Sequence, residues 1–317
     1  MRVCDNDDLE SVACDFCKSD EASLKYTRAD GLTVTECSIC GLAYLNPRPK
    51  NDIIEHFYDQ DYFTGVSANS GLGGLKCEVA HDRSKPHKAA SPRPIKLLSD
   101  NFGGVRNKAI LEIGCATGDL LAALKEGGAI VRGIEYSRYA AEVARERGLD
   151  VTVGTLEDYA ASDELFDIIV AFEVIEHVLS PMRFLLKASS LVRTNGLLLL
   201  STPNYSGAHR HHSDWAGFNY SFEHIYFFSL DVLKRMAFKA GFDLLYWEST
   251  IDPTGPPYAR NYFYKQINKI SILSTLIVEI GFFRTLDLVF WKRSPLFIPF
   301  GNGRTLTLVL RKMDLFR

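Results

Sequence analysis

From Lys108 onward, short apolar runs alternate with segments whose apolar residues recur at helical spacing. The apolar runs, which are predicted to be strands, are Ala109–Ile113, Ile130–Ile134, Val151–Val153, Phe166–Phe172 and Gly196–Ser201. The predicted helices between them are Asp119–Glu126, Arg138–Arg147 and Met182–Leu191. Such alternation is typical of a parallel sheet that is covered by helices on both faces. We therefore expect an α/β fold with a doubly wound sheet, to which Phe242–Trp247 and Thr305–Leu310 add two strands.

Four cysteines before this region form two CxxC pairs, Cys14/Cys17 and Cys37/Cys40, with nineteen residues between the pairs. Each pair can supply half of a tetrahedral zinc site, and the segments between the pairs have the strand character of a β-ribbon. We expect a zinc ribbon with Cys14, Cys17, Cys37 and Cys40 as ligands, rather than four unrelated thiols. A closed four-cysteine site is structural, because it leaves no open position for chemistry.

Charge and composition restrict the environment of the chain. Lys and Arg number 36 against 39 Asp and Glu, so the net charge of −3 supplies no general attraction to nucleic acid or anionic lipid. The first ten residues carry four acidic side chains, unlike a secretory signal, and no stretch reaches the ~18 apolar residues of a membrane span. Cysteines arranged for a metal indicate a reducing compartment. We expect a cytoplasmic protein.

The first predicted strand ends in a glycine turn, residues 114–118, which passes directly into a helix. Glycines there let the backbone approach a ligand at the carboxyl end of the strand. Glu135 ends the second strand twenty-one positions after Gly114, where a carboxylate can bind both ribose hydroxyls. A dinucleotide fingerprint needs glycine where Ala116 and Asp119 stand. The acidic Glu112 and Asp119 instead suit a ligand with an amino group and a sulfonium, as in S-adenosylmethionine.

The segments 111–118, 133–137, 166–178 and 197–204 resemble the class I S-adenosylmethionine-dependent methyltransferases over residues 106–250. The resemblance implies a Rossmann-like seven-stranded sheet of order 3-2-1-4-5-7-6 with an antiparallel last strand. It implies that Gly114 and Gly118 shape the methionine pocket, Glu135 binds the ribose and Tyr136 flanks the adenine. The full set of expected cofactor-binding residues is Glu112, Gly114, Cys115, Ala116, Gly118, Glu135, Tyr136, Leu156, Glu157, Phe172 and Glu173.

The N-terminal region resembles a subset of that family in which a ribbon, an Asn-Pro-Arg-Pro segment and a Tyr-Asp-x-Asp-Tyr-Phe segment precede the methyltransferase domain. Residues 46–49 and 58–63 carry the two later segments here. Members of the subset, including sugar C-methyltransferases, modify sugars, glycans and small metabolites. The expected division of the chain is a zinc ribbon (1–50), a linker and helical cap (51–105), the methyltransferase domain (106–250), an apolar insert (251–300) and the last strand (301–317).

Acidic and imidazole groups follow the fourth and fifth predicted strands. If the first segment is helical, Glu173, Glu176 and His177 share one face at the cofactor rim, and Glu223 and His224 follow the fifth strand at the same sheet edge. In one interpretation His177 or His224 is a general base, assisted by Glu173 and Glu223. In a second, Glu173, Glu176, His177 and His224 bind a divalent cation, as in the similar E-x-x-E-H…H set of small-RNA 2′-O-methyltransferases and ubiquinone-pathway O-methyltransferases. In a third, the segment is a framework turn.

These features predict methyl transfer from S-adenosylmethionine to a hydroxyl or carbon of a sugar, glycan or small metabolite. The alternatives are metal-assisted RNA 2′-O-methylation and a non-catalytic S-adenosylmethionine-binding protein whose ribbon contacts a partner. The basic run 209–212 is a solvated loop or a patch for an anionic acceptor. The apolar stripe within 270–300 is core, a homodimer interface or a helix at a membrane surface.

Overall fold

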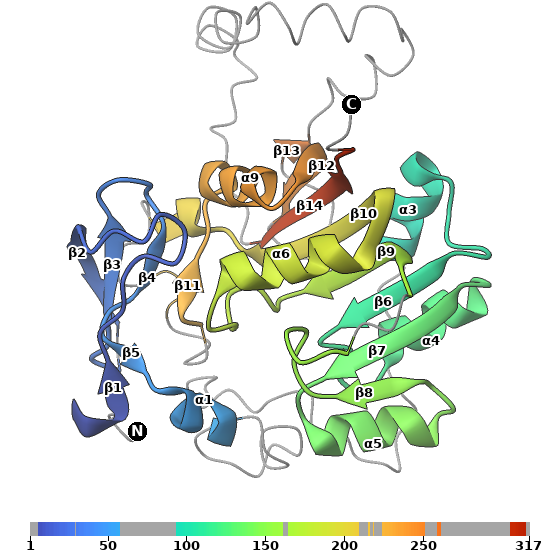
Figure 1. Ribbon diagram of the computed structural model, residues 1–317, viewed down its shortest axis with the longest axis horizontal. Coiled ribbons are helices and arrows are strands. Elements are labelled where there is room, and N and C mark those ends of the chain that lie inside the picture. Colours follow the sequence, from blue (N-terminus) through green and yellow to red (C-terminus); the bar gives the residue numbers. More distant parts are fainter. Residues whose placement is uncertain are drawn as a thin grey trace, which may run out of the picture.

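The computed structural model describes residues 6–28, 30–57, 93–160, 164–208, 215, 218, 224–250, 259–260 and 305–314 (Figure 1). Several expectations fall outside these residues: the segment 58–63, the basic run 209–212, Glu223 and the apolar stripe of 270–300. Among the described residues, no helix has the length and apolar character that crossing a membrane requires. The limits of the expected domains stay a prediction.

One mixed sheet forms the centre of the molecule. Its strands are β6 (Ala109–Ile113), β7 (Ile130–Glu135), β8 (Val151–Val153), β9 (Phe166–Phe172), β10 (Val192–Pro203), β12 (Phe242–Thr250), β13 (Ala259–Arg260) and β14 (Thr305–Lys312). They lie in the order β13-β12-β14-β10-β9-β6-β7-β8. The strands from β8 to β10 are parallel, whereas β14 is antiparallel to both β10 and β12. The expected 3-2-1-4-5-7-6 order is therefore confirmed, and the two-residue β13 extends the edge.

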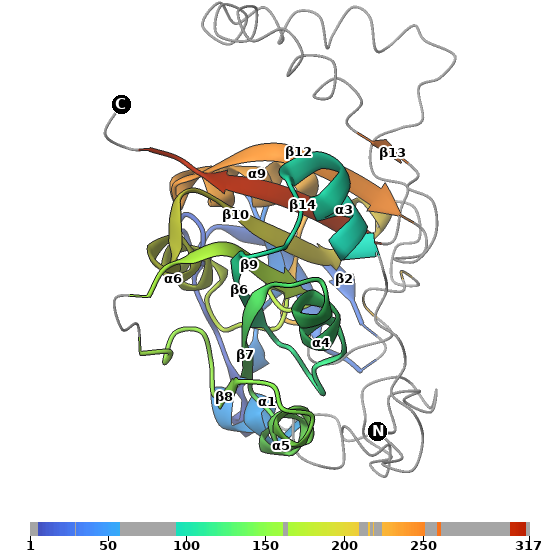
Figure 2. The same cartoon turned by 90° about the vertical axis from the view of Figure 1, so that its right-hand side faces the viewer.

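Helices cover both faces of this sheet because its central strands are apolar on both sides. The helices are α3 (Arg93–Phe102), α4 (Asp119–Glu126), α5 (Arg138–Glu146), α6 (Pro181–Leu191) and α9 (Leu230–Lys239). Leu98 and Leu124, from α3 and α4, pack with Ile110 of β6 in one buried cluster. Leu185 of α6 packs with Leu111 of β6 in another. Figure 2 shows α3 and α4 on one side of the sheet and α6 on the other.

A second, smaller sheet lies beside α6 and α9 (Figure 1). Its strands are β2 (Ala22–Thr27), β3 (Thr33–Cys37), β4 (Ala43–Leu45) and β11 (Tyr226–Phe227), in the antiparallel order β11-β4-β3-β2. Around it lie η1 (Asn6–Asp8), the pair β1 (Leu9–Glu10) and β5 (Arg48–Pro49), α1 (Asn51–Phe57) and η2 (Tyr205–Gly207). The strand β11 comes from the region after β10, so a segment from the middle of the chain completes the N-terminal sheet.

The two sheets share a buried core, which explains why the smaller one packs so closely. Val34 and Leu45 of the N-terminal sheet belong to the same buried cluster as Leu185 and Met236 of α6 and α9. A small sheet of short strands buries little apolar surface by itself, and the neighbouring helices add to its core. We call residues 9–49 the ribbon below.

Candidate functional site

The turn between β6 and α4 requires glycine at two positions. Gly114 and Gly118 have φ angles of 69° and 84°, in the left-handed region. A Cβ on Gly114 would lie 2.6 Å from Cγ2 of Val174, and one on Gly118 would collide with Cδ1 of Leu149. The N–H groups of Gly114 and Cys115 donate to the carbonyl of Ile134 at 2.8 and 3.2 Å, which joins the turn to β7. Glycine is therefore required here by the left-handed backbone and by the close packing of Val174 and Leu149, at the carboxyl edge of the sheet where ligands bind in such folds.

Glu135 connects this turn to the start of α5. Its Oε2 accepts the N–H of Ala116 and its Oε1 accepts the N–H of Ser137, each at 2.8 Å. Burial raises the pKa of its carboxyl, although these backbone bonds act in the opposite direction. Tyr136, the next residue, is 36% exposed at the surface. Carboxylate oxygens have further lone pairs, so the expected ribose contact stays compatible with this arrangement.

Glu112 lies in β6, just before the turn, and no cationic side chain among the described residues pairs with it. Its side chain is buried, Oε2 has no hydrogen-bond partner among the described residues, and burial, then Glu135, then Asp119 raise its pKa well above the usual range. The other acid, Asp119, is paired with Arg147 at 2.7 Å, so its charge is already balanced within the chain. Glu112 is thus the acid that the sequence proposed for a cationic ligand and that the structure leaves available.

The other residues expected at the cofactor lie at the same edge with different exposure. Cys115 is buried, and burial raises the pKa of its thiol, so it is a packing residue and no nucleophile. Leu156 is buried after β8, and the adjacent Glu157 is half-buried with a pKa that burial raises. Phe172 is half-buried at the end of β9. The structure brings these residues to one edge, and their contacts with a cofactor stay a prediction.

Glu173 follows β9 in a left-handed conformation, with φ of 53°. Its N–H donates to the carbonyl of Ser201 at 3.0 Å, and the Ser201 hydroxyl donates to its Oε1 at 2.7 Å. Glu173 is exposed, and partial desolvation of its carboxyl raises its pKa. Ser201 was not predicted as a partner of Glu173, although it ends the fifth predicted strand, at the same sheet edge.

The segment after Glu173 forms a turn at residues 175–177 instead of the helical turn considered above. The N–H of His177 donates to the carbonyl of Val174 at 3.0 Å, which closes the turn. A shared helical face therefore does not exist there. Adjacent residues of a tight turn can point to a common centre, which adjacent residues of a helix cannot do.

Glu176, His177 and His224 meet at that centre. One ligand atom from each lies within 4.8 Å of the others, and Oε1 of Glu176 is 3.9 Å from Nε2 of both histidines. Glu176 is 1% exposed, and neither of its carboxylate oxygens has a hydrogen-bond partner among the described residues. Burial and then Glu173 raise its pKa well above the usual range. Of the four ligands expected for a divalent cation, the structure groups these three, while Glu173 bonds to Ser201.

This donor set fits a divalent cation. Ligand atoms about 2.1 Å from one metal ion lie roughly 3–4 Å apart, which agrees with the 3.9 Å between Glu176 and each histidine. Two imidazoles and one carboxylate are ligands typical of Zn²⁺, Mn²⁺ or Fe²⁺ and leave positions open for a further ligand. A buried carboxyl without hydrogen bonds stays protonated unless a cation faces it and stabilises its charged form.

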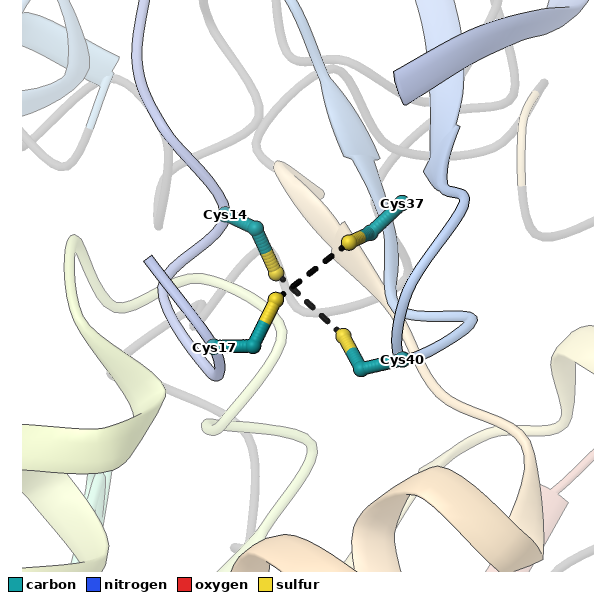
Figure 3. Close-up of side chains that lie close together, drawn as sticks. All are labelled: Cys14, Cys17, Cys37 and Cys40. Atoms are coloured by element: carbon teal, nitrogen blue, oxygen red, sulfur yellow. Dashed lines mark hydrogen bonds between the residues drawn. The ribbon is translucent and has the colours of Figure 1, made fainter. Parts of the chain in front are cut away.

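The four cysteines of the ribbon also converge (Figure 3). Their sulfur atoms lie within 4.8 Å of one another, with Cys14 to Cys40 and Cys17 to Cys37 at 3.4 Å, and all four are free thiols. Tetrahedral zinc with bonds of about 2.3 Å requires sulfur separations near 3.8 Å. Burial raises the pKa of Cys14, and raises that of Cys40 to about 11, so the thiolates of these two residues need a cation to stabilise them. The group fits zinc, whose presence stays a prediction.

Comparison with known proteins places this fold and turn in a family. Residues 82–246, 165 of the 317, match the family described as "Methyltransferase domain". The chain belongs to this family. Together with the strand order, the match confirms the expected class I S-adenosylmethionine-dependent methyltransferase fold.

Curated relatives of this methyltransferase domain share part of its length. The chain is 34% identical over 131 residues to the ubiquinone biosynthesis O-methyltransferase of Histophilus somni, covering 38% of this chain and 55% of the relative. It is 33% identical over 131 residues to the same-named protein of Actinobacillus pleuropneumoniae, covering 38% and 56%. The chain thus spans about half the length of the curated relatives it matches.

Two solved structures are similar to it. One is a possible histamine N-methyltransferase from Thermotoga maritima, at 21% identity and TM-score 0.47, covering 71% of this chain and 87% of that one. The other is a methyltransferase from Mesorhizobium loti, at 15% identity and TM-score 0.47, covering 70% and 98%.

Proposed function

We propose that this protein transfers a methyl group from S-adenosylmethionine to a hydroxyl oxygen of a small metabolite, at a site that includes a divalent cation held by Glu176, His177 and His224. One observation carries the proposal. A buried carboxylate without hydrogen bonds faces two imidazoles, within the loops that follow the fourth and fifth strands of a methyltransferase sheet. Those loops leave the edge at which class I methyltransferases bind their ligands.

Support for the donor comes from the turn after β6. Its glycines allow a sharp left-handed turn at the carboxyl end of β6, and Glu112 supplies an acid for an ammonium or sulfonium group. A second carboxylate, Glu135, is held rigidly by two backbone N–H groups beside the same turn. The pyrophosphate of a dinucleotide would meet Glu112 unfavourably.

The proposed chemistry asks little more of the protein than alignment. The methyl group on a sulfonium is already activated, so the acceptor oxygen must be placed in line with the carbon–sulfur bond and must lose its proton. A divalent cation supplies Lewis acidity that lowers the pKa of a bound hydroxyl. Glu173, an exposed residue whose carboxyl pKa is raised, can accept the proton that the acceptor hydroxyl releases. Ser201 orients that carboxyl through its hydroxyl.

The choice of acceptor follows the names of the relatives. Those named above are O-methyltransferases of ubiquinone biosynthesis, which supports an oxygen atom on a small molecule. Nothing in the comparisons supports the sugar, glycan or carbon acceptor that the N-terminal resemblance suggested. We also propose that the four ribbon cysteines hold one structural zinc ion, which stabilises the ribbon and takes no part in the chemistry.

The test uses the zinc-loaded full chain with S-adenosylmethionine labelled on its methyl group, a cell extract as the source of acceptors, and added Mn²⁺ or EDTA. We expect Mn²⁺-stimulated transfer of label to the small-molecule fraction, and loss of transfer in Glu176→Gln with unchanged binding of S-adenosylmethionine by calorimetry. The exposed Glu142, on α5, gives the matched control Glu142→Gln.

Each other outcome identifies an alternative. Label in RNA would favour RNA methylation, and binding of S-adenosylmethionine without any transfer would favour a non-catalytic protein. If EDTA and Glu176→Gln left transfer intact while His224→Gln abolished it, His224 would be a general base and the cation would be wrong.

A further inference from the structure

The loop that carries His224 is held on two sides by backbone hydrogen bonds. On one side, the N–H groups of Ile225 and Tyr226 both donate to the carbonyl of Glu176, at 3.0 and 3.1 Å. On the other side, the N–H of Leu45 in the ribbon donates to the carbonyl of Ile225 at 2.9 Å, and β11 continues this pairing with β4. The relative position of His224 and Glu176 therefore depends on a segment fixed to the ribbon.

Arg28 adds a side-chain contact to the same loop. It lies at the tip of the hairpin between β2 and β3, and its Nη1 donates to the carbonyl of His224 at 3.0 Å. The guanidinium is fully buried and is paired with Asp30, at 2.7 Å from Nη2 and 3.3 Å from Nε. The N–H of Leu32 donates a hydrogen bond to Oδ1 of Asp30 at 3.1 Å. A planar guanidinium fixed in this way has little freedom left, so its bond to His224 is preorganised.

Two further ribbon side chains hold the loop that carries His177. Asp15, inside the first CxxC pair, accepts the N–H of Met182 and the hydroxyl of Ser180, each at 2.8 Å, at the start of α6. Arg48 donates to the carbonyl of Leu179 at 2.8 Å. The turn with Glu176 and His177 lies directly before these residues. The ribbon therefore contacts the backbone of the two loops that carry His177 and His224.

We infer that Arg28 is a positioning residue for His224, and that the ribbon is a fixed part of the scaffold of the active site. Its effect on catalysis rests on the function proposed above. Its effect on the loop does not, because the contacts exist whether or not the protein transfers methyl groups. The chain gives no sequence motif for this role, since Arg28 lies between the two CxxC pairs in a turn without a signature.

Hydrogen exchange of the loop tests the inference directly. The variant Arg28→Met/Asp30→Asn removes both charges of the buried pair together, so neither is left alone. We expect exchange of the Ile225 and Tyr226 amides in the full, zinc-loaded chain to be at least about tenfold faster than in the wild type. The matched control is Arg145→Met, because Arg145 also donates to a backbone carbonyl, that of Val151 at 2.8 Å, far from His224 in the chain.

A second variant covers the case in which the double variant does not fold. Arg28→Lys keeps the charge beside Asp30 but loses the planar group that reaches His224, and we expect a smaller acceleration of the same two amides. Unchanged exchange at Ile225 and Tyr226 in Arg28→Lys and in the folded double variant would overturn the inference. Equal acceleration in Arg145→Met would overturn it as well, because the effect would then be a general loss of stability.

Methyl transfer by the same proteins separates this inference from the proposed function. We expect kcat of the Arg28 variants to fall about ten- to a hundredfold with unchanged affinity for S-adenosylmethionine, as a displaced catalytic group predicts. A wild type that transfers no methyl group refutes the proposed function, while the exchange data still decide the role of Arg28. Faster exchange with full kcat would show that the loop position does not matter for the reaction.

Discussion

Alanine substitutions at Gly118 and Gly148 together separate two causes of lost stability, backbone strain and steric collision. Gly118 and Gly148 both have left-handed backbones, with φ of 84° and 74°. An alanine at 148 meets no atom within 4 Å. The Cβ of an alanine at 118 would lie closer to Cδ1 of Leu149 than the 3.0 Å that Cβ atoms keep in real structures, and 3.2 Å from Cβ of Ala144. Gly148→Ala therefore measures backbone strain alone, and Gly118→Ala measures strain plus a collision.

The magnitudes follow from these contacts. Left-handed backbone costs an alanine about 1–2 kcal/mol, partly offset because alanine also restricts the unfolded chain by about 0.4–1 kcal/mol. We expect Gly148→Ala to lower the free energy of unfolding by about 1 kcal/mol. Overpacking adds about 1–3 kcal/mol, so Gly118→Ala should lower it by about 2–4 kcal/mol. Gly118→Ala should also weaken binding of S-adenosylmethionine, whereas Gly148→Ala should leave it unchanged.

Urea unfolding of the two variants measures both free energies under one condition. A double-mutant cycle with Leu149→Ala then isolates the collision. Leu149→Ala alone should lower the free energy of unfolding by about 2–5 kcal/mol, because the side chain is buried. In the Gly118→Ala background the same truncation should cost clearly less, because it also removes the collision. Equal destabilisation by Gly118→Ala and Gly148→Ala, or additive effects in the cycle, would refute the reasoning.

Three further predictions concern buried charge and the ribbon. In the absence of S-adenosylmethionine, Glu112→Gln should raise stability at pH 7–8 and not at pH 4. The raised pKa of Glu112 makes the wild type less stable as the pH rises above the ordinary value of 4.5, by up to about 1.4 kcal/mol per pH unit. Thermal unfolding against pH measures this, and an equal response of the exposed control Glu142→Gln would contradict it. Asp15→Asn should lower the free energy of unfolding in urea by about 1–3 kcal/mol, because Asp15 accepts hydrogen bonds at the start of α6. Asp231→Asn, which breaks an exposed ion pair, should lower it by under about 1 kcal/mol. Similar losses in the two variants would argue against a role of Asp15 in capping α6. Cys40→Ser should reduce bound zinc and the midpoint of thermal unfolding together, and a full equivalent of zinc by elemental analysis would contradict a four-thiolate site.

Local pattern was enough to predict the central sheet. The apolar runs at 109–113, 151–153 and 166–172 became strands with the expected bounds. The runs 109–113 and 166–172 lie in central strands that are buried on both faces, so most of their residues are apolar. The β10 strand begins earlier than expected, at Val192, because Val192 pairs with Phe166 before the register shifts at Leu197.

The candidate site was predictable only in part. Glu176 and His177 are neighbours in the chain, and His224 follows the next strand, so their common sheet edge could be inferred. Their actual meeting depends on a turn where a helix was considered, and on the backbone bonds from Ile225 and Tyr226 to Glu176. The displacement of Glu173 from this group depends on Ser201, which is distant in sequence.

Residue pattern alone was enough to assign the strands, the glycine turn and the four-cysteine group, because each depends on spacing within a short stretch of chain, whereas the order of the strands followed from the resemblance to class I methyltransferases. Only the tertiary structure decided that β11 joins the N-terminal sheet, and that Arg28 lies against His224, 196 positions away. The physical reason is burial. A small sheet with unpaired edge groups is stable only against a larger core, and which distant backbone satisfies those groups is decided when the two surfaces pack together.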